Sequence, residues 1–401
     1  MKARNFSEIR DLFDPQKPLR GSDLIYYVDR GSGLTDKIKW NIESISKPQK
    51  IIFPVMRGNG NTTELNKLAE DLKNDFFIVY IDAIETLDPI DIEYVDVLLL
   101  TGFKIYEAVK KKVEIPERLV ESLENWSKEV VEEVVKEKVI GAEAGINFIF
   151  NLFAKILTEV SIRKSLRQVT EPKLSDLIDI INKIIAICEE KLDKKILVIV
   201  DSLDRIIDSQ RAIDLFCLHS PALTSLNCNT LYVVSIIIKH RLEYLMIIRS
   251  FDVDVWLPNV KIFERNGKRA EKGFDFMKKI ALNRMEEKLI TDEALEYAIE
   301  MSGGVVHDFI RIIKESAFEA HKKGKEKIEK DDVENVVIDL RRDYQIILTE
   351  HHLNILKKVK DTGKKIDDPA FTELLHALVI LPYTNDGEWY AVHSILGQIL
   401  G

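Results

Sequence analysis

Five short runs of apolar residues, rich in β-branched side chains, are spaced along the first two thirds of the chain. Longer stretches with helical periodicity separate them, so the pattern alternates between strands and helices. Continuous apolar runs of four to eight residues are typical of strands buried on both faces of a parallel sheet. We therefore predict an α/β fold with a doubly wound parallel sheet. The five runs are Ile51–Met56, Phe76–Ile81, Ile196–Val200, Leu231–Ile238 and Val253–Leu257.

A long segment between the second and third runs carries three amphipathic patterns, which predict a helical insertion at about residues 88–170. The patterns cover Val95–Val113, Ile115–Lys138 and Ile146–Val169. The most apolar part, Val139–Thr158, is interrupted by polar residues such as Glu143 and Lys155, so it is too polar for a membrane span. We expect it to form a buried helix.

The strand pattern stops near Phe263, and four helical patterns follow. They cover Gly273–Glu287, Asp292–Met301, Gly304–Lys322 and Asp331–Leu340. The last sixty residues predict two helices and then a hairpin, because two apolar segments flank the turn signal Asn385-Asp386-Gly387. Two helices followed by a hairpin are typical of a winged-helix module. The predicted domains are an N-terminal arm (1–45), a sheet core (46–262), a helical lid (263–340) and a winged-helix-like module (341–401).

Composition narrows the function classes. The 401 residues are 46% hydrophobic and 31% charged, which supports a large core and excludes a disordered chain. A net charge of -9 excludes a polybasic nucleic-acid coat, although a local basic patch stays open. Three cysteines without metal-ligand spacing, and no apolar signal core at the N-terminus, favour a reducing, cytoplasmic location. Abundant Lys, Glu and Ile are a bias seen in thermophiles.

The first strand leads into a glycine-rich turn and then an amphipathic helix, which is the layout of a nucleotide phosphate loop. Glycines allow the backbone to approach phosphates, and the helix N-terminus offers unpaired N–H groups. Against the pattern G-x-x-x-x-G-K-[ST], Gly60 and Thr62 match, Val55 replaces the first glycine and Asn61 replaces the lysine. Asn61 carries no charge for the phosphates. The alternative is a Gly/Asn turn that only caps a helix.

The third strand ends at Asp201, where open α/β sheets bind their ligands. In phosphate-loop enzymes such an aspartate orders Mg²⁺ and its waters. Ser202 stands where a catalytic glutamate is usual, and Asp204 is the next carboxylate that could orient a water molecule. The alternative is an aspartate that caps the following helix. Two matched elements in the right order favour the nucleotide-binding interpretation.

These motifs resemble those of phosphate-loop ATPases of the AAA+ and STAND groups, in particular the archaeal Orc/Cdc6-like and related prokaryotic ATPases, with a degenerate Walker A motif. The resemblance covers roughly residues 20–340. It rests on Arg57–Leu65, on Val198–Arg205 and on the lid-like segments within Ile290–Val337.

The resemblance implies roles for individual residues. Phosphate and cofactor contacts would come from Arg57, Gly58, Asn59, Gly60, Asn61, Thr62 and Thr63. Thr62 and Asp201 would serve Mg²⁺, and ATP or ADP would be the cofactor. Adenine is expected between the arm, near Tyr26–Asp29, and the lid. His307 stands where similar lids place a sensor arginine, with Arg311 one turn further on.

Several assignments stay open. The first sensor residue is either Ser235 or Asn229, and an arginine finger could be Arg205, Arg211 or Arg241. Asn61, Ser202 and His307 all depart from the family pattern in ways that weaken hydrolysis. Gly31-Ser-Gly33 is interpreted as a plain turn. His351-His352 have no Cys or further His at metal-ligand spacing, so metal binding is not expected there.

We therefore expect a nucleotide-binding switch or scaffold with weak or absent hydrolysis, which controls assembly with a protein partner or with itself. One alternative is a DNA-associated ATPase resembling Orc/Cdc6 or transposition regulators. The C-terminal module is nearly neutral, with seven Lys/Arg and eight Asp/Glu over residues 341–401, which favours a protein contact over DNA. Another alternative is an interaction scaffold that binds no nucleotide. A membrane partner is not expected.

Overall fold

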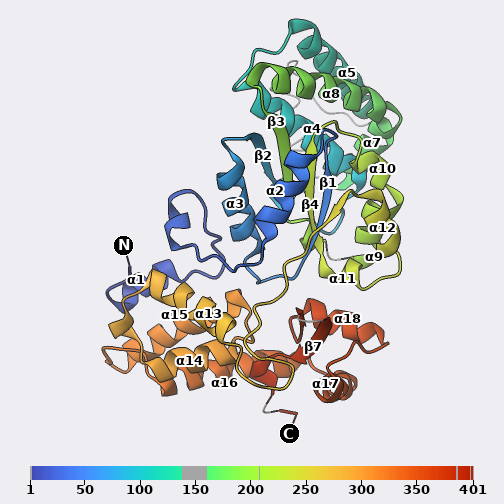
Figure 1. The fold of residues 1–401 in the computed structure, drawn as a ribbon. Coiled ribbons are helices and arrows are strands. Elements are labelled where there is room, and N and C mark those ends of the chain that lie inside the picture. Colours follow the sequence, from blue (N-terminus) through green and yellow to red (C-terminus); the bar gives the residue numbers. More distant parts are fainter. Residues whose placement is uncertain (1, 138–159, 207, 385–386, 398, 401) are drawn as a thin grey trace. The chain divides into compact units, whose positions relative to one another are not determined.

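Strands and helices alternate along the first part of the chain in the computed structural model, which describes residues 2–137, 160–206, 208–384, 387–397 and 399–400 (Figure 1). The described chain divides into two compact units. The loop unit consists of residues 1–33, 55–67 and 257–401, and the sheet unit of residues 34–54 and 68–256.

The sheet follows the order β2-β3-β4-β1-β5 and is parallel. The predicted doubly wound α/β sheet is therefore confirmed. The strands are β1 (Lys50–Val55), β2 (Phe76–Asp82), β3 (Lys195–Asp201), β4 (Asn229–Ser235) and β5 (Val253–Asp254). Helices before and between them are α2 (Leu34–Ser44), α3 (Asn61–Leu72), α4 (Tyr94–Lys110), α5 (Glu117–Glu137), α7 (Val160–Thr170), α8 (Leu174–Leu192), α9 (Ser209–Ile213), α10 (Ser220–Leu223), α11 (Ile236–Lys239) and α12 (Tyr244–Ser250).

Alternate residues of the strands enter opposite faces of the sheet, and both faces are buried. Val198 and Val200 lie in the large core cluster of the sheet unit, whereas Leu197 and Ile199 are equally buried but belong to the other face. Burial on both faces is why the strands read as continuous apolar runs rather than as alternating ones.

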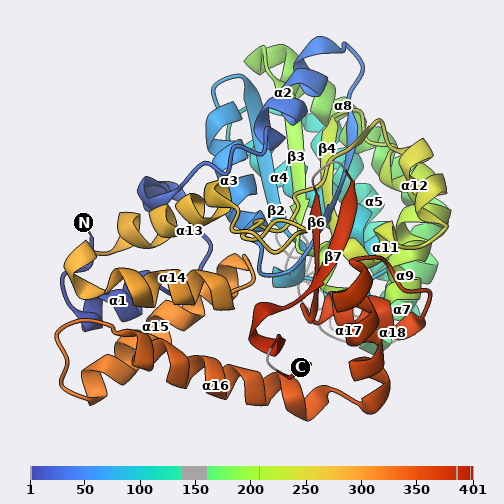
Figure 2. The same ribbon diagram turned by 60° about the horizontal axis from the view of Figure 1, so that its bottom comes forward.

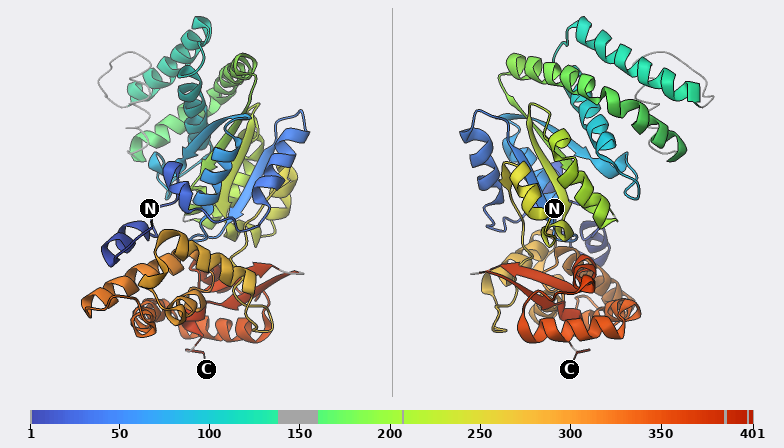
Figure 3. Two further views of the ribbon diagram at one scale, coloured as in Figure 1. Left: turned by 60° about the vertical axis from the view of Figure 1, so that its left-hand side comes forward. Right: turned by 90° about the vertical axis from the view of Figure 1, so that its right-hand side faces the viewer.

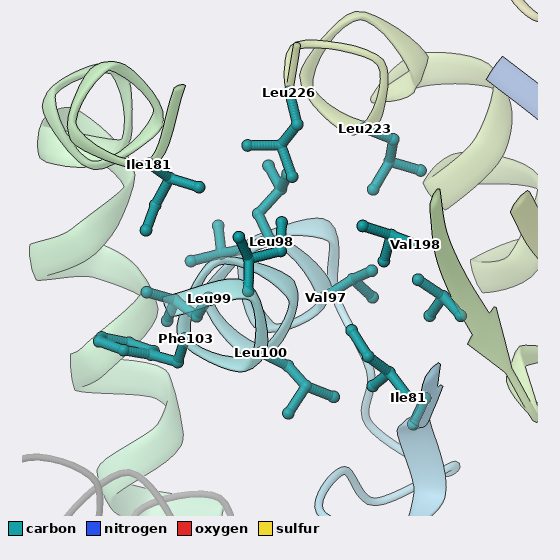
Figure 4. Close-up of a cluster of buried hydrophobic side chains, with 14 of the residues drawn as sticks. Ile81, Val97, Leu98, Leu99, Leu100, Phe103, Ile181, Val198, Leu223 and Leu226 are labelled. Carbon is teal, nitrogen blue, oxygen red and sulfur yellow. The ribbon is translucent and has the colours of Figure 1, made fainter. Parts of the chain in front are cut away.

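The α4 helix lies between the sheet and α8, as the side chains in Figure 4 show. Its residues Val97, Leu98 and Phe103 are buried among Ile81 and Val198 of the strands and Ile181 of α8. The helix is therefore apolar around most of its circumference. The α5 helix packs against α7 and α8, away from the sheet (Figure 3). Residues 146–159 of the third predicted helix, and the buried helix expected at 139–158, lie outside the described residues.

One predicted strand is too long. The run Leu231–Ile238 forms β4 only as far as Ser235, and Ile236 begins the short helix α11. The hydroxyl of Ser235 accepts a hydrogen bond from the Ile237 N–H at 3.3 Å and so caps the helix. A run of isoleucines looks the same in the sequence whether it forms a strand or a buried helix. The Ser235 cap is what starts a helix at Ile236.

The loop unit has a helical core built from the predicted lid helices and the N-terminal helix (Figure 2). These are α1 (Phe6–Leu12), α13 (Glu271–Arg284), α14 (Asp292–Met301), α15 (Val306–Lys322) and α16 (Lys330–Ile347). The C-terminal module follows as α17 (Glu350–Thr362), α18 (Pro369–His376), β6 (Ile380–Thr384) and β7 (Glu388–Val392). Its two strands pair antiparallel as expected, while the turn residues 385 and 386 lie outside the described part.

Candidate functional site

Two glycines with positive φ shape the glycine-rich loop between β1 and α3. Gly58 and Gly60 adopt φ values of +73° and +81°, in the left-handed region that favours glycine. A Cβ on Gly60 would meet no atom within 4 Å, so this part of the loop is open. A Cβ on Gly58 would lie 3.1 Å from Cβ of His307 and 3.2 Å from Cγ1 of Val305. Gly58 therefore permits the lid to approach, and Gly60 leaves room for a ligand.

The α3 helix begins at Asn61, directly after the loop. The first N–H groups of a helix have no intrahelical acceptor, and the helix dipole favours an anion there. Thr62 is half-buried in this first turn. The hydroxyl of Thr63 accepts the backbone N–H of Leu19 at 3.0 Å, so this side chain anchors the N-terminal arm.

The N-terminal arm makes three further hydrogen bonds, one with the loop and two with α3. Asn66 Nδ2 donates to the Leu19 carbonyl at 2.9 Å, and Arg30 Nη1 donates to the Asn59 carbonyl at 3.0 Å. The Tyr27 hydroxyl donates to Glu64 Oε2 at 2.9 Å. Burial raises the pKa of Glu64, and the nearby Arg30 opposes this shift. The arm segment expected to face adenine is therefore in contact with α3.

Asn61, which stands in place of the lysine, folds back across the loop. Its Nδ2 donates to the Met56 carbonyl at 2.5 Å, and the side chain is only 8% exposed. Its Oδ1 is buried and has no hydrogen-bond partner among the described residues. The same holds for Oδ1 of Asn59, which is 2% exposed.

The lid contacts the loop through a backbone hydrogen bond. The His307 N–H donates to the Gly58 carbonyl at 2.8 Å. Its ring faces Asp308, with Nδ1 at 3.1 Å from Oδ1. Arg311 is partly exposed, and its Nη2 lies 3.5 Å from Oδ2 of Asp343. The sensor roles predicted for His307 and Arg311 stay predictions.

Asp308 is a buried carboxylate that joins the lid to the C-terminal module. Its Oδ2 lies 3.1 Å from Nε2 of His393 and 3.5 Å from the hydroxyl of Tyr344. Nδ1 of His393 accepts the Ile395 N–H at 3.3 Å, so Nε2 carries the proton given to Asp308. Burial alone would raise the pKa of Asp308, but His307 and His393 together hold it well below its usual value. The hydrophobic pattern of the sequence did not predict that Asp308, His393 and Tyr344 lie together.

The C-terminal module also contacts the loop. Leu378, which follows α18, has φ +59°, an unusual value for leucine. Its Cδ1 would lie 3.5 Å from a Cβ on Gly58. Burial, together with the charge of Arg57, lowers the pKa of His376. Side chains of α15 and of the C-terminal module therefore both lie next to Gly58.

In the sheet unit, Asp201 closes β3 with a buried carboxylate. Its Oδ2 accepts the Tyr80 hydroxyl at 2.6 Å and its Oδ1 accepts the Ser202 N–H at 2.7 Å. Ser202 has φ +71°, and Asp204 is buried in the 3₁₀ turn that follows. Tyr80 lies on the neighbouring strand β2, where Asp82 is the register partner of Asp201. The sequence gave no sign of this tyrosine.

The two candidates for the first sensor residue lie at opposite ends of β4. Ser235 lies at the carboxyl end of β4, whereas Asn229 begins the strand and bonds the Gln49 N–H and the Ile196 carbonyl. Only Ser235 thus has the position expected of a sensor at the carboxyl edge. Arg211 Nη1 pairs with Asp91 at 2.9 Å, which gives this arginine a structural partner.

The residues of the loop fit the phosphates of a nucleotide in backbone geometry but not in charge. Two left-handed glycines and the start of α3 are features that suit an anion, while Asn61 stands at the position of the lysine. Among the described residues, no group of three or more His, Cys, Asp and Glu side chains is arranged to hold a metal ion. No helix in the described part of the chain is sufficiently long and apolar to cross a membrane.

Searches against protein-family models and against curated proteins returned no match. Several solved structures are similar to this chain over almost its full length. Cdc6p of Pyrobaculum aerophilum is 12% identical, with 97% of this chain and 95% of that chain covered and a TM-score of 0.45. A Walker-type ATPase of Pyrococcus abyssi is 16% identical, with 97% and 99% covered and a TM-score of 0.48.

The Orc1 protein of Aeropyrum pernix, solved in complex with DNA, is 12% identical, with 99% and 97% covered and a TM-score of 0.47. The chain is thus similar in structure to Orc/Cdc6-like ATPases, the group that its motifs resemble.

Proposed function

We propose that this protein is a nucleotide-binding switch, which binds ATP or ADP with Mg²⁺ and hydrolyses ATP weakly or not at all. The observation that carries the proposal is the loop between β1 and α3, with Gly58 and Gly60 in the left-handed conformation. Successive N–H groups in this geometry, at the start of a helix, form an anion-binding concavity. Thr62 would contact the metal, and Asp201 would orient its waters.

Weak hydrolysis follows from two missing groups. Asn61 has no positive charge to stabilise the phosphates as they react, and Ser202 cannot act as a general base. Asp204 is the remaining carboxylate of the turn after β3. A protein of this kind would change its state according to whether ATP or ADP is bound, rather than hydrolyse ATP rapidly.

The contacts around Gly58 support a switch rather than a passive binding site. The Gly58 carbonyl accepts the His307 N–H at 2.8 Å, and His307 borders the buried Asp308 that reaches His393. A ligand that moves the loop would therefore change the energy of contacts in the lid and the C-terminal module. Coupling of this kind is reciprocal, so a partner bound to the C-terminal module would alter nucleotide affinity.

Titration of the purified chain with labelled ATP and ADP, each with Mg²⁺, tests the proposal. We expect saturable binding of one nucleotide per chain and tighter binding in Asn61→Lys, which restores the missing charge. A Gly60→Ala variant should lose at least about tenfold in affinity. Gly267→Ala is the matched control, because Gly267 also has a positive φ (+78°) and open space at its Cβ position.

Both alanine variants should cost about 1–2 kcal/mol of folding stability, because each forces an L-residue into the left-handed region. Only Gly60→Ala should lose nucleotide. If neither the natural chain nor Asn61→Lys binds nucleotide, the switch is excluded, and the scaffold without nucleotide becomes the better explanation.

A second candidate function, association with DNA, is favoured by a basic cluster at the end of α17. Residues 357–365 contain five exposed lysines and one acidic residue. The exposed Arg265 adds its charge here, because its Nη2 donates to the Thr362 carbonyl at 3.3 Å. The five lysines are Lys357, Lys358, Lys360, Lys364 and Lys365.

Fluorescence anisotropy with duplex DNA at low salt tests this candidate. Binding should weaken with rising salt, and Lys364→Gln with Lys365→Gln should reduce the salt slope by about two. Lys111→Gln with Lys112→Gln is the control, because these two exposed lysines follow α4, outside the basic cluster. Absence of binding at low salt excludes the DNA role.

A further inference from the structure

The α12 helix presents an apolar face to solvent at the side of the sheet unit, next to α10 (Figure 1). Its inner side is anchored, because Tyr244 and Ile247 are buried and the Tyr244 hydroxyl donates to Oδ1 of Asp254 at 2.7 Å. On its outer side Leu245 is 57% exposed and Met246 is 59% exposed. A surface helix usually turns polar side chains to water, so this outer face requires an explanation.

The apolar face extends beyond the helix on both sides. Leu242 is 86% exposed and lies in the helical turn that leads into α12, since the Leu245 N–H donates to the Leu242 carbonyl at 3.2 Å. Leu218 is 66% exposed and ends the short helical turn that packs against α12. Its neighbour Cys217 has its Sγ 4.0 Å from Sδ of Met246. These contacts define one continuous apolar patch, which consists of Leu218, Leu242, Leu245 and Met246.

The apolar patch is large enough for a specific interface. At these exposed fractions it presents on the order of 400 Å² of apolar surface, a size at which patches mark interaction sites rather than scattered residues. Two such patches brought together, with the polar groups around them, bury about 1,000 Å², the least that a specific interface needs. The area therefore suits an occupant with an apolar face of the same size, and a second copy of the chain offers one.

The charges at the two ends of the face favour that second copy. Glu243 stands three residues before Met246 and Arg249 three residues after it, so the two charges are about 9 Å apart along the helix. Arg249 is exposed and has no ion pair among the described residues. Glu243 lies 3.6 Å from Arg241 in an exposed pair, which is worth little. When two such helices meet antiparallel, Arg249 of each comes level with Glu243 of the other.

We propose that the apolar patch is the two-fold interface of a homodimer, in which α12 of each chain packs antiparallel on α12 of the other. The inner side of α12 is already anchored, so docking orders few additional groups. A two-fold interface is self-complementary and closes after two copies, so it forms a dimer and not a filament. The proposal is independent of the nucleotide site, because every residue of the patch lies in the sheet unit.

Sedimentation equilibrium of the full chain without nucleotide, over roughly 1–100 μM, tests the dimer. We expect dimers at the upper end of this range. Leu245→Asp places a charge in the centre of the patch and should raise the dissociation constant at least about thirtyfold. Trp40→Ser is the matched control, because Trp40 is 73% exposed on α2 of the same unit and should leave the constant unchanged. Monomers at every concentration would overturn the proposal.

Exchange of the two charges tests the antiparallel arrangement. Arg249→Glu alone and Glu243→Arg alone each set like charges at the same level of the two helices, and each should weaken the dimer about tenfold. The double variant restores opposite charges and should recover the affinity of the natural chain. A double variant as weak as the single variants would overturn the antiparallel pairing.

Cross-linking identifies the face that the two copies share. A residue beside the two-fold axis faces its own copy, so Leu245→Cys, in a Cys217→Ser background, should be joined between chains by a short bismaleimide reagent. The other cysteines, Cys188 and Cys228, are buried. Ile45→Cys in the same background is the control, because Ile45 is 46% exposed after α2 and should not be joined. Dimers that resist cross-linking through Leu245→Cys would place the interface elsewhere and overturn the proposal.

Discussion

At the scale of single residues, Glu64 shows how the fold changes the chemistry of an ordinary side chain. It lies in the first turn of α3 and is buried against the hydroxyl of Tyr27. Burial raises the pKa of its carboxyl group above the ordinary value. In the sequence this glutamate is one acidic residue among many in amphipathic helices, and nothing distinguished it.

A raised pKa makes stability depend on pH with a definite sign. Between the unfolded value of about 4.3 and the raised folded value, the folded chain binds more protons than the unfolded chain. The free energy of unfolding should therefore fall as pH rises through this window. In Glu64→Gln the decrease should be smaller, because the amide stays neutral while its oxygen can still accept from Tyr27.

Denaturant unfolding of the natural chain and of Glu64→Gln across this pH window measures the effect. Glu70→Gln is the control, because Glu70 lies on the same helix and is exposed beside Lys73. An unchanged pH slope in Glu64→Gln would show that the carboxyl group titrates normally.

At the scale of elements, the turn between α14 and α15 meets several parts of the loop unit. The Gly303 carbonyl accepts Nδ2 of Asn259 at 2.8 Å and the Tyr383 hydroxyl at 2.6 Å. A Cβ on Gly304, whose φ is +77°, would lie 1.8 Å from the Val260 carbonyl oxygen. Asp308, at the start of α15, reaches His393 beyond β7. These polar contacts join the lid to the C-terminal module.

Asp308→Asn should loosen this junction. The amide replaces an oxygen with a donor, which then faces the proton on either His307 or His393 and leaves a buried group unpaired. We expect a loss of about 2–4 kcal/mol in unfolding free energy. Hydrogen exchange should become faster in β6, β7 and residues 393–396 than in α13.

Asp343→Asn is the control, because its exposed carboxylate lies 3.5 Å from Arg311 and such pairs are worth little. If hydrogen exchange in the C-terminal module is unchanged in Asp308→Asn, other contacts hold the module and the buried carboxylate is dispensable.

At the scale of the whole molecule, the residues that the structure describes form two large apolar cores, one in each unit. Within the sheet unit, buried ion pairs join the first and last parts of the insertion to each other. Arg167 is 7% exposed and its Nη2 lies 2.6 Å from Oδ2 of Asp96, which is 1% exposed. Arg163 is 1% exposed, and its Nε lies 3.3 Å from Oδ2 of Asp91. Charges this deeply buried are costly when they lose a partner.

Two cores predict two unfolding transitions, and Asp96→Ala should shift only the transition of the sheet unit. The guanidinium of Arg167 keeps Asp91 and Glu93 as partners, so the loss of Asp96 should cost about 1–3 kcal/mol in that transition. Calorimetry, with hydrogen exchange to assign each transition, measures this. Glu43→Gln removes an exposed pair with Lys39 and should change neither transition measurably. An equal shift of both transitions would show that the chain unfolds as a single cooperative body.

Most elements could be predicted because their signals are local. The α14 helix has the predicted bounds, Asp292–Met301. The Thr291 hydroxyl caps it by accepting a hydrogen bond from the Ala294 N–H at 3.2 Å. The glycine loop after β1 was also predictable, since only glycine accepts its backbone angles readily. The predicted roles of Asn61, Asp201 and His307 remain predictions for experiment.

The sequence by itself determined where strands and helices form, because periodicity, caps and glycines act within a few residues. Only the tertiary structure decided which side chains meet across long separations. It joined Asp308 to His393, Tyr80 to Asp201 and Leu19 to Thr63, and it left Oδ1 of Asn61 buried without a described partner. Such pairs depend on the register of strands and the packing of helices, which burial of the whole apolar surface sets and no local pattern contains.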